Sequence, residues 1–592
     1  MQKRLLHLLT ALYFVFACET LVAQESQVFV APHGKDTNIG SPKSPFQTAQ
    51  RAQEKVREII ASGRRGPITV FFAGGYYELE KPLVFDHRDS GSKDHPVVYS
   101  ALPNATVTLS GGRKITGWKP GTSGHWEATF PQQKDSNWFF RQLVVNNRKA
   151  TRARWPNENG GLRVATVNAD VNEFTLDHPI GVIKPESQTE MVVFQNWSVT
   201  RGLVTSTENQ RVRTATPMGW IGHGPATTTS KGKAVFFENA LQYIDQPGEW
   251  FLDAKKRRVY YASLKSEDVP NADIIAPYLE QLVRIEGDVK NPVTNLHFRG
   301  LRFEHSRFDL PAIGYNEIQA GHYGSSQAAP TFVQPVAIEC RFANSCTFRH
   351  CGFAYLNGSG IGIGEGCVSV RLEHCSIREV GGNGVMVGWR GKGKMAEDQV
   401  GKLDADWARS EHAPNHCAVT DCRIQRCGAD SFGGTGIWVA FSRNTRIVHN
   451  TINDLPYTGI SAGFRWNSNP SSQSNCLIES NHIFDVMGKL ADGGGIYTLG
   501  YQPGTVIRKN FIHKVHRSGF AHGNAENNGI FFDQGSKGFL IEKNVIRKTS
   551  GEPIRFNQSK RLSHTWRVNY FGRLVSKLEP AMQIRESAGA KK

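Results

Sequence analysis

Gly495-Ile-Tyr-Thr498 and Gly529-Ile-Phe-Phe532 are two copies of a short apolar segment that recurs through the C-terminal half of this chain. Each copy follows a residue at a second recurring position by 9, 14 or 19 residues. The members of that second position are Cys351, Cys375, Cys422, Asn450, Asn481, Asn510 and Asn544. They are spaced 24 to 47 residues apart, a period typical of stacked supersecondary units. With two strands per repeat, this pattern predicts a solenoid.

The residues of each repeat alternate with period two, which assigns side chains to the two faces of a strand. The first and third positions after the glycine are apolar, as at Ile437 and Val439, and should fill the interior. The second and fourth positions then point outward. Short strands, Gly and Asn turns and no 3.6-residue pattern between them predict an all-β fold, a right-handed parallel β-helix.

The rest of the chain divides around this solenoid. Residues 24–116 predict an N-terminal cap and the first coils, with a short amphipathic helix from about Thr48 to Ile60 closing the open end. Residues 117–277 lose the register and predict an inserted β-sandwich-like domain. The β-helix resumes over residues 278–558, and a C-terminal cap or tail follows over 559–592.

The first 23 residues resemble a secretory signal peptide. Lys3 and Arg4 precede an apolar run, and Leu21-Val22-Ala23 reads as a cleavage site. The apolar run is too short to span a bilayer, so no membrane span is expected. We therefore expect an exported protein of the periplasm or cell surface, with a lipid anchor at Cys18 as the alternative.

Charge and cysteine content narrow the partners. The net charge of +17 over 592 residues suits an anionic polysaccharide or a lipid surface, while the lack of any nucleic-acid-binding motif argues against nucleic acid. Several cysteines share repeat positions, which indicates stacked interior thiols rather than disulfides. The spacing Cys417-x4-Cys422-x4-Cys427 has no second ligand pair, so we expect neither a metal nor another cofactor.

The outward positions of the segment after the glycine suit a sugar. The second position carries aromatic residues, among them Trp438 and Tyr497, and the fourth carries mostly small residues and ends at Asp533. Aromatic rings stack on the C–H faces of sugars, and small residues leave room for them. Extra residues enter each long repeat at one corner and should overhang this row. The expected partner is an oligosaccharide or polysaccharide.

Four acidic residues lie in or beside those corner insertions: Asp430, Asp492, Glu526 and Asp533. Hydrolysis of a glycosidic bond typically uses two carboxyl groups, one protonated and one ionised. Simple stacking makes Asp492 and Glu526 neighbours, whereas Asp492 and Asp533 are seven positions apart in register, about 23 Å along a straight strand. Pairing Asp492 with Asp533 requires the glycine run after Asp492 to fold back over the sheet.

The chain resembles glycoside hydrolase family 141 through motifs spread over the mature sequence. These are Phe29-Val-Ala-Pro-His-Gly-Lys-Asp36, Gly40-Ser-Pro-Lys-Ser-Pro-Phe46, Leu109-Ser-Gly-Gly112, Gln142-Leu-Val-Val-Asn-Asn147, Arg152-Ala-Arg-Trp-Pro-Asn157, Glu238-Asn-Ala240, Pro247-Gly-Glu-Trp-Phe-Leu-Asp253 and Asp492-Gly-Gly-Gly-Ile-Tyr497. The resemblance implies a β-helix with an added β-domain. It also implies an exo-acting α-L-fucosidase on plant pectin, or a xylanase. Its two catalytic aspartates correspond to Asp492 and Asp533, with Glu526 in reserve.

Around that pair we expect substrate contacts from Trp438, Tyr497, Trp389, Trp466, Glu526, His522 and Arg465. Each feature also has a purely structural reading: Asp492 and Asp533 as turn residues, and the tryptophans as covers for apolar surface. His513, His516 and His522 are further candidates for an active-site histidine or for metal ligands. A polysaccharide lyase and a non-catalytic glycan-binding solenoid are the competing functions.

Overall fold

The computed structural model describes residues 25–591 except 64–65, 122–123, 131–137, 158–160, 184–187, 222–223, 225, 312–313, 319–320, 325–330, 390–410, 522, 524 and 576. The expected signal peptide, Cys18 and His522 lie outside this part of the chain. In the described part, no helix is long and apolar enough to cross a membrane.

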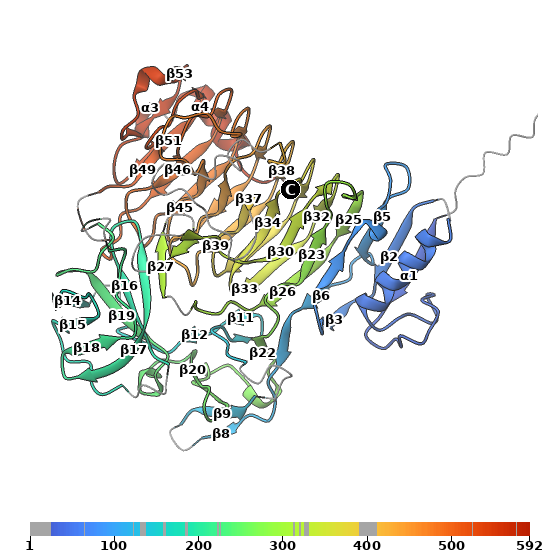
Figure 1. The fold of residues 1–592 in the computed structure, drawn as a ribbon, viewed down its shortest axis with the longest axis horizontal. Coiled ribbons are helices and arrows are strands. Elements are labelled where there is room, and N and C mark those ends of the chain that lie inside the picture. Colours follow the sequence, from blue (N-terminus) through green and yellow to red (C-terminus); the bar gives the residue numbers. More distant parts are fainter. Residues whose placement is uncertain are drawn as a thin grey trace, which may run out of the picture.

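Three long parallel sheets wind around one core and form a β-helix (Figure 1). Sheet 1 contains, in spatial order, β1 (Ser26–Val30), β2 (Ile68–Phe72), β5 (Val97–Ala101), β25 (Leu296–Arg299), β32 (Thr347–Arg349), β35 (Arg371–Glu373), β38 (Ala418–Thr420), β41 (Arg446–Val448), β44 (Leu477–Glu479), β47 (Val506–Arg508), β50 (Leu540–Glu542) and β53 (Thr565–Trp566). Sheet 2 contains β3 (Gly75–Glu78), β6 (Val107–Ser110), β26 (Leu301–Ser306), β33 (Gly352–Leu356), β36 (Ser376–Val380), β39 (Arg423–Cys427), β42 (Thr451–Asn453), β45 (His482–Val486), β48 (Phe511–Val515), β51 (Val545–Thr549) and β54 (Tyr570–Phe571). Sheet 3 contains β4 (Leu83–Phe85), β23 (Val283–Glu286), β30 (Val336–Arg341), β34 (Ser359–Gly364), β37 (Val385–Trp389), β40 (Ile437–Val439), β43 (Ile460–Ala462), β46 (Gly494–Thr498), β49 (Asn528–Phe532) and β52 (Ile554–Phe556).

Each full coil contributes three strands, so the expectation of two strands per repeat was wrong. The missed strands are those of sheet 1, such as β35 and β41, which are only three residues long. Three residues show at most one full alternation between inward and outward positions, too little for a period-two signal. The short strands β24 (Val293–Thr294) and β31 (Ala343–Asn344) add one small parallel pair.

The interior has the predicted side chains. The apolar residues at the first and third positions of sheet 3, among them Ile437, Val439, Ile530 and Phe532, are buried in one continuous core. At the turn before each sheet 2 strand, Asn450, Asn481, Asn510 and Asn544 form a ladder in which each amide donates to the next at 2.9–3.0 Å. The ladder satisfies buried amides coil by coil and ends at Asn569, which the repeat analysis missed. The nine cysteines of the described chain are free and buried, as stacked thiols require.

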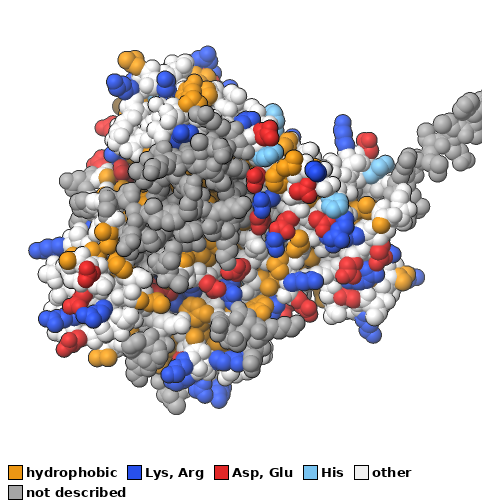
Figure 2. All heavy atoms as spheres, viewed as in Figure 1, with side chains coloured by type: hydrophobic (Ala, Val, Ile, Leu, Met, Phe, Trp, Pro, Cys, Tyr) orange, Lys and Arg blue, Asp and Glu red, His pale blue; other side chains and the backbone are white. Residues whose placement is uncertain are grey.

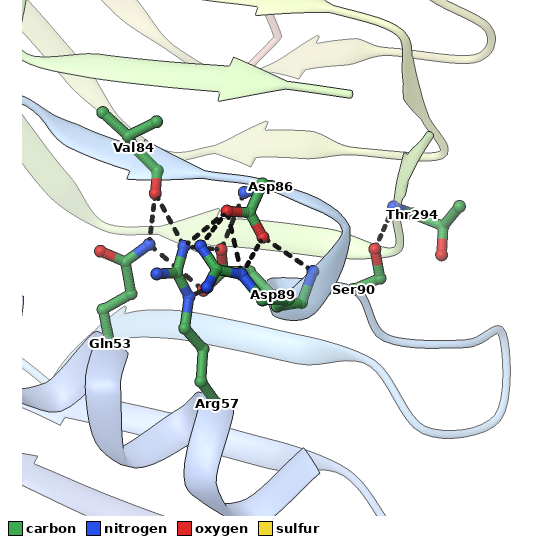
Figure 3. A network of polar contacts seen from close by, with 8 residues as sticks. Gln53, Arg57, Val84, Asp86, Asp89, Ser90 and Thr294 are labelled. Atoms are coloured by element: carbon green, nitrogen blue, oxygen red, sulfur yellow. Dashed lines mark hydrogen bonds and ion pairs between the residues drawn. The ribbon is translucent and has the colours of Figure 1, made fainter. Parts of the chain in front are cut away.

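Helix α1 (Ala49–Ala61) covers the N-terminal end of the β-helix, beside β2 in Figure 1. Thr48 is its N-cap, and Ala49, Ala52 and Val56 pack into the core. The predicted capping helix is therefore confirmed. Its polar side is fastened as well, because Arg57 forms an ion pair with Asp89 of the short helix η1 (His87–Asp89) at 2.7 Å (Figure 3).

The opposite end is closed by the C-terminal segment. Helices α3 (Gly572–Val575) and α4 (Glu579–Ser587) follow β54, and the 3-10 turn η6 (Arg561–Ser563) precedes β53. Ala581 and Ile584 of α4 pack on Phe511 and Val545 at the outer face of sheet 2. On the face seen in Figure 2, basic and acidic side chains are interspersed, so the positive net charge is spread over that surface.

Strands between β6 and β23, together with the later β27, β28 and β29, build a largely antiparallel region beside the β-helix. One sheet contains β11 (Arg148–Lys149), β10 (Val144–Val145), β22 (Ile274–Pro277) and β7 (Gly112–Lys114); a second contains β12 (Thr151–Arg152), β20 (Glu249–Asp253), β21 (Arg258–Tyr261), β9 (Trp126–Thr129) and β8 (Lys119–Pro120). The largest contains β13 (Arg154–Trp155), β19 (Ala234–Glu238), β14 (Leu162–Val167), β15 (Glu173–Leu176), β18 (Arg211–Thr214), β17 (Val199–Glu208), β27 (Tyr315–Ile318), β28 (His322–Gly324) and β29 (Thr331–Phe332), with β16 (Glu190–Phe194) paired to β17 and β19. The 3-10 turns η3 (Leu241–Tyr243) and η4 (Val269–Asn271) complete it.

The inserted region and the corner loops enter the β-helix at the same place. The inserted strands lie between β6 of sheet 2 and β23 of sheet 3, and the hairpin β27–β28 lies between β26 of sheet 2 and β30 of sheet 3. The long loops before β40, β46 and β49 also join sheet 2 to sheet 3. In the described residues, nearly all long insertions therefore lie at the corner between sheet 2 and sheet 3.

Candidate active site

The outward residues of sheet 3 form a row in strict register. Neighbouring strands align Met386 with Trp438, Trp438 with Ser461, Ser461 with Tyr497, Tyr497 with Phe531 and Phe531 with Arg555. This row follows from the period of the repeat, because parallel strands of equal spacing place equivalent positions side by side. The corner loops border it at the edge where sheet 2 joins sheet 3.

Asp533 follows the last residue of β49 and is 6 % exposed. Its carboxylate accepts hydrogen bonds from the Tyr497 hydroxyl at 2.6 Å and from the Asn557 amide at 2.7 Å. Burial raises the pKa of Asp533, the two hydrogen bonds oppose that rise, and the negative charge of Asp492 adds to it. A carboxyl with a raised pKa can hold a proton for donation to a leaving group.

Asp492 lies in the corner loop before β46 and adopts a left-handed backbone conformation, with φ of 59°. Its Oδ1 atom accepts an ion-paired hydrogen bond from Arg555 at 2.8 Å. The neighbouring Ala491 N–H donates to the Asn196 carbonyl of the inserted region at 2.9 Å. The loop that carries Asp492 is therefore held from both the β-helix and the inserted region.

The structure brings Asp492 and Asp533 close enough for their charges to interact. Two long side chains bridge the register difference between them. Arg555 and Tyr497 are the neighbours of Phe531 on either side of β49, with the guanidinium 4.3 Å from the Phe531 ring centroid and the two rings edge to face at 5.4 Å. Arg555 bonds to Asp492 and Tyr497 bonds to Asp533, so the side chains that hold the two carboxylates pack on the same aromatic ring.

Glu526 is exposed, and its charge acts on Arg517. No hydrogen bond or ion pair joins it to Asp492 among the residues that the structure describes. Stacking of equivalent loop positions therefore did not identify the partner of Asp492. Arg555, the last outward residue of the row, is a further residue of this candidate site.

The aromatic residues of the row differ in access. Trp438 is 2 % exposed, because His322 of β28 and Phe464 cover its ring at 5.0 and 5.5 Å. Trp466 is half-buried and packs against both Phe464 and the cluster that contains Tyr497 and Phe531. Trp466 is therefore the tryptophan that combines partial exposure with closeness to the aspartate pair.

Other expected contact residues fall in different places. Arg465 is buried and donates to Asn467 and to the Pro470 carbonyl at 2.9 and 3.1 Å, which ties its own loop together. Trp389 ends β37, but its side chain lies outside the described residues, as does His522. Asp430 forms an ion pair with Lys149 of the inserted region at 2.5 Å. This ion pair joins the inserted region to the first corner loop, and it does not involve Asp492.

The histidines expected as alternatives also have structural partners. His513 contacts His482 at 2.9 Å on sheet 2, and His516 contacts Asp485 at 2.9 Å. Within the described residues, no group of three or more His, Cys, Asp or Glu side chains is arranged to hold a metal ion.

The inserted region packs on all three corner loops. Phe194 of β16 contacts Phe432 of the first loop and Phe520 of the third, with ring centroids 5.4 and 4.5 Å apart. Ala491 of the second loop bonds to Asn196, as described above. The sequence placed these loops over one row but did not show that the inserted region supports them.

A parallel β-helix with two interacting carboxylates beside an outward aromatic row is an architecture typical of enzymes that act on carbohydrates. Residues 331–470 match the family of the right-handed beta helix region, and residues 123–263 match the GH141 insertion domain. A solved glycoside hydrolase is similar over 96 % of this chain and 99 % of its own, with 25 % identity and a TM-score of 0.84. The structure of XylC with xylose is similar over 93 % of this chain and 76 % of its own, with 12 % identity and a TM-score of 0.52. No curated protein sequence matches the chain.

These matches identify the chain as a glycoside hydrolase with a region similar to the GH141 insertion domain. The resemblance inferred from the sequence motifs is confirmed, and so is the right-handed β-helix.

Proposed function

We propose that this enzyme is an exo-acting α-L-fucosidase that removes terminal residues from plant pectic glycans. The GH141 type supports the fucosidase assignment through the family resemblance. The observation that carries the catalytic assignment is that the charge of Asp492 acts on the buried Asp533, whose pKa is raised. The apolar segment between Leu5 and Ala17 supports export of the enzyme to the periplasm or cell surface.

In this proposal the two aspartates divide the chemistry. Asp533 donates its proton to the glycosidic oxygen as the bond breaks, because its raised pKa keeps that proton available. Asp492 enters as the ionised partner of Arg555 and supplies the second carboxylate at the opposite side of the scissile bond. Tyr497 and Asn557 hold the Asp533 carboxyl in one orientation.

Exo action is supported by how the corner is built. Three loops stand beside the row, and the inserted region packs on each of them. Walls on one side of a β-helix favour a pocket that admits a chain end over an open groove that binds a chain along its length.

The test is a panel of aryl glycosides, with α-L-fucoside and β-D-xyloside included, and pectic oligosaccharides. Wild type should release fucose, and Asp492→Asn and Asp533→Asn should each lose roughly 10³-fold in kcat. Asp485→Asn is the matched control, since Asp485 is half-buried near the end of β45 and paired with Lys514 and His516. Full activity in both site variants would refute the catalytic assignment.

The same panel separates the competing activities. Release of xylose in place of fucose would replace the fucosidase with a xylanase. An ultraviolet-absorbing unsaturated product would indicate a lyase. Glu526→Gln should keep full activity, and its inactivation would return Glu526 to the catalytic pair.

A further inference from the structure

A cavity lies between the inserted region and the outer face of sheet 2. It has a volume of about 400 Å³, within the range of small-molecule sites. Seven basic and three acidic side chains line it, an excess of four positive charges. It contains neither Asp492 nor Asp533, so it is separate from the candidate active site.

Part of that positive charge is neutralised within the protein. Lys149 is paired with Asp430, and Arg426 is paired with Glu379. Arg148 is paired with Glu267 at 2.8 Å. The third acidic residue of the lining, Glu238, is paired with Arg201 at 2.6 Å.

Two arginines at the cavity have no such neutralisation. Arg154 lies over the Phe236 ring and donates to the Asn157 carbonyl, and Arg378 lies over the Tyr355 ring and donates to its hydroxyl at 2.7 Å. Among the described residues, neither arginine forms an ion pair with a carboxylate. Both are half-buried, so their guanidinium groups stay accessible from the cavity.

Arg152 is a further basic residue that lines the cavity. It is 8 % exposed and pairs with Glu190 through Nη1, yet its Nε and Nη2 groups have no hydrogen-bond partner in the described structure. Buried donors without partners cost about 1–3 kcal/mol each, so proteins rarely leave them unsatisfied. Burial also lowers the pKa of Arg152, which shows that its surroundings disfavour the charge. A negative charge in the cavity would offset the second of these costs.

We propose that this cavity binds an anionic sugar residue, one bearing a carboxylate or a sulfate ester, through Arg154, Arg378 and Arg152. Planar guanidinium groups bind both anions through paired hydrogen bonds, which Lys cannot reproduce. A sugar is the chemical class expected because the chain is a glycoside hydrolase. The site goes beyond the proposed function, since it binds without cleaving and does not depend on which bond the aspartates break.

Calorimetric titration of the full chain tests the proposal, with the Asp492→Asn variant used to prevent hydrolysis. The probes are a galacturonate disaccharide, a sulfated disaccharide and a neutral digalactose. At least one anionic probe should bind, at least about 10-fold more tightly than the neutral one, and its affinity should fall with added salt. The tighter of the two anions identifies the charged group. Equal binding of all three probes, or no binding of either anion, overturns the proposal.

Substitutions then locate the site. Arg154→Gln and Arg378→Gln should each weaken the anionic probe about 10-fold. Arg213→Gln, at an exposed ion pair elsewhere in the inserted region, is the matched control and should bind as the parent does. Arg378→Lys keeps the charge and guards against a folding defect; it should bind with intermediate affinity. Parent-like affinity in both Gln variants overturns the assignment, and cleavage of a neutral aryl glycoside by Arg378→Gln should stay unchanged.

Discussion

Glu190 and Asp533 are both almost fully buried carboxyl groups, 1 % and 6 % exposed, but their pKa values move in opposite directions. Burial alone would raise the pKa of Glu190, yet Arg141, Arg152 and Arg201 surround it and hold that pKa well below its usual range. Asp533 accepts hydrogen bonds from two neutral side chains and faces the negative charge of Asp492, and its pKa is raised.

The two carboxyl groups differ in the charges around them: Glu190 is surrounded by arginines, and Asp533, the proposed acid, is not. Burial is similar in both places, so the neighbouring charges decide the outcome. A carboxylate among arginines is fixed in its ionised form and joins elements of the fold. A buried carboxyl beside a like charge has a raised pKa, which favours its protonated form. A strongly perturbed pKa marks a functional group only when its direction suits the chemistry.

The largest expected effect is on catalysis at Asp533. Asp533→Asn should lower kcat by roughly 10³-fold, because the amide cannot donate the proton that the leaving group needs. Its melting temperature should not fall, since a buried carboxyl without a cation contributes little to stability. Steady-state kinetics and thermal denaturation measure the two effects. A large drop in melting temperature with intact kcat would make Asp533 structural and remove the distinction from Glu190.

The reverse result is expected at Glu190. Glu190→Gln should destabilise the fold by about 3–5 kcal/mol, because it leaves buried guanidinium groups without their shared carboxylate. Denaturant unfolding measures the loss. Glu173→Gln breaks an exposed pair with Arg213 and should leave the unfolding midpoint in place. An unaltered midpoint in Glu190→Gln would show that the arginines are satisfied without it.

The two carboxyls should also respond to pH with opposite signs. The pKa of Glu190 is lower in the folded state, so its contribution to stability is present above the unfolded pKa of about 4.3 and is lost as pH falls below it. The pKa of Asp533 is higher in the folded state, so its contribution is present below about 3.9 and is lost as pH rises through the folded pKa. Unfolding free energies of wild type and each variant, measured across this range, should show the two slopes. Slopes of the same sign would contradict the comparison.

The smallest expected effect comes from Tyr497. Its hydrogen bond lowers the pKa of Asp533, so Tyr497→Phe should raise that pKa and move the alkaline limb of the kcat/KM profile to higher pH. The change in kcat/KM at the optimum should be about 3- to 10-fold. Tyr76→Phe removes a hydroxyl bonded to Ser110 in the first coils and serves as the control. A limb that stays in place would mean that Tyr497 does not act on Asp533.

The repeat made most of the β-helix predictable. Equivalent positions stack in parallel strands, so the inward Ile437 and Val439, the outward Trp438 and the Asn481 ladder could be assigned from spacing alone. The short strands of sheet 1 were not predicted, because three residues show too little alternation between inward and outward side chains. The contact of His322 with Trp438 was not predicted either, because His322 lies in a hairpin outside the repeat.

The site was predictable in its residue types and not in its contacts. Asp492 and Asp533 were predicted as the pair through family resemblance, while register alone favoured Glu526. Arg555 and Tyr497 join the aspartates by side-chain reach across Phe531, and reach does not appear in a strand register. Asp430 looked like a member of the acidic set, and its partner Lys149 lies far away in the sequence.

The sequence by itself determined the coil, its inward and outward faces, the capping helix and the corner where extra residues enter, because each depends on local period and spacing. Only the tertiary structure decided which carboxyl has its pKa lowered by arginines and which has its pKa raised by burial. That decision depends on charges contributed by segments distant in the chain, and electrostatic energy follows distance in space rather than position in sequence.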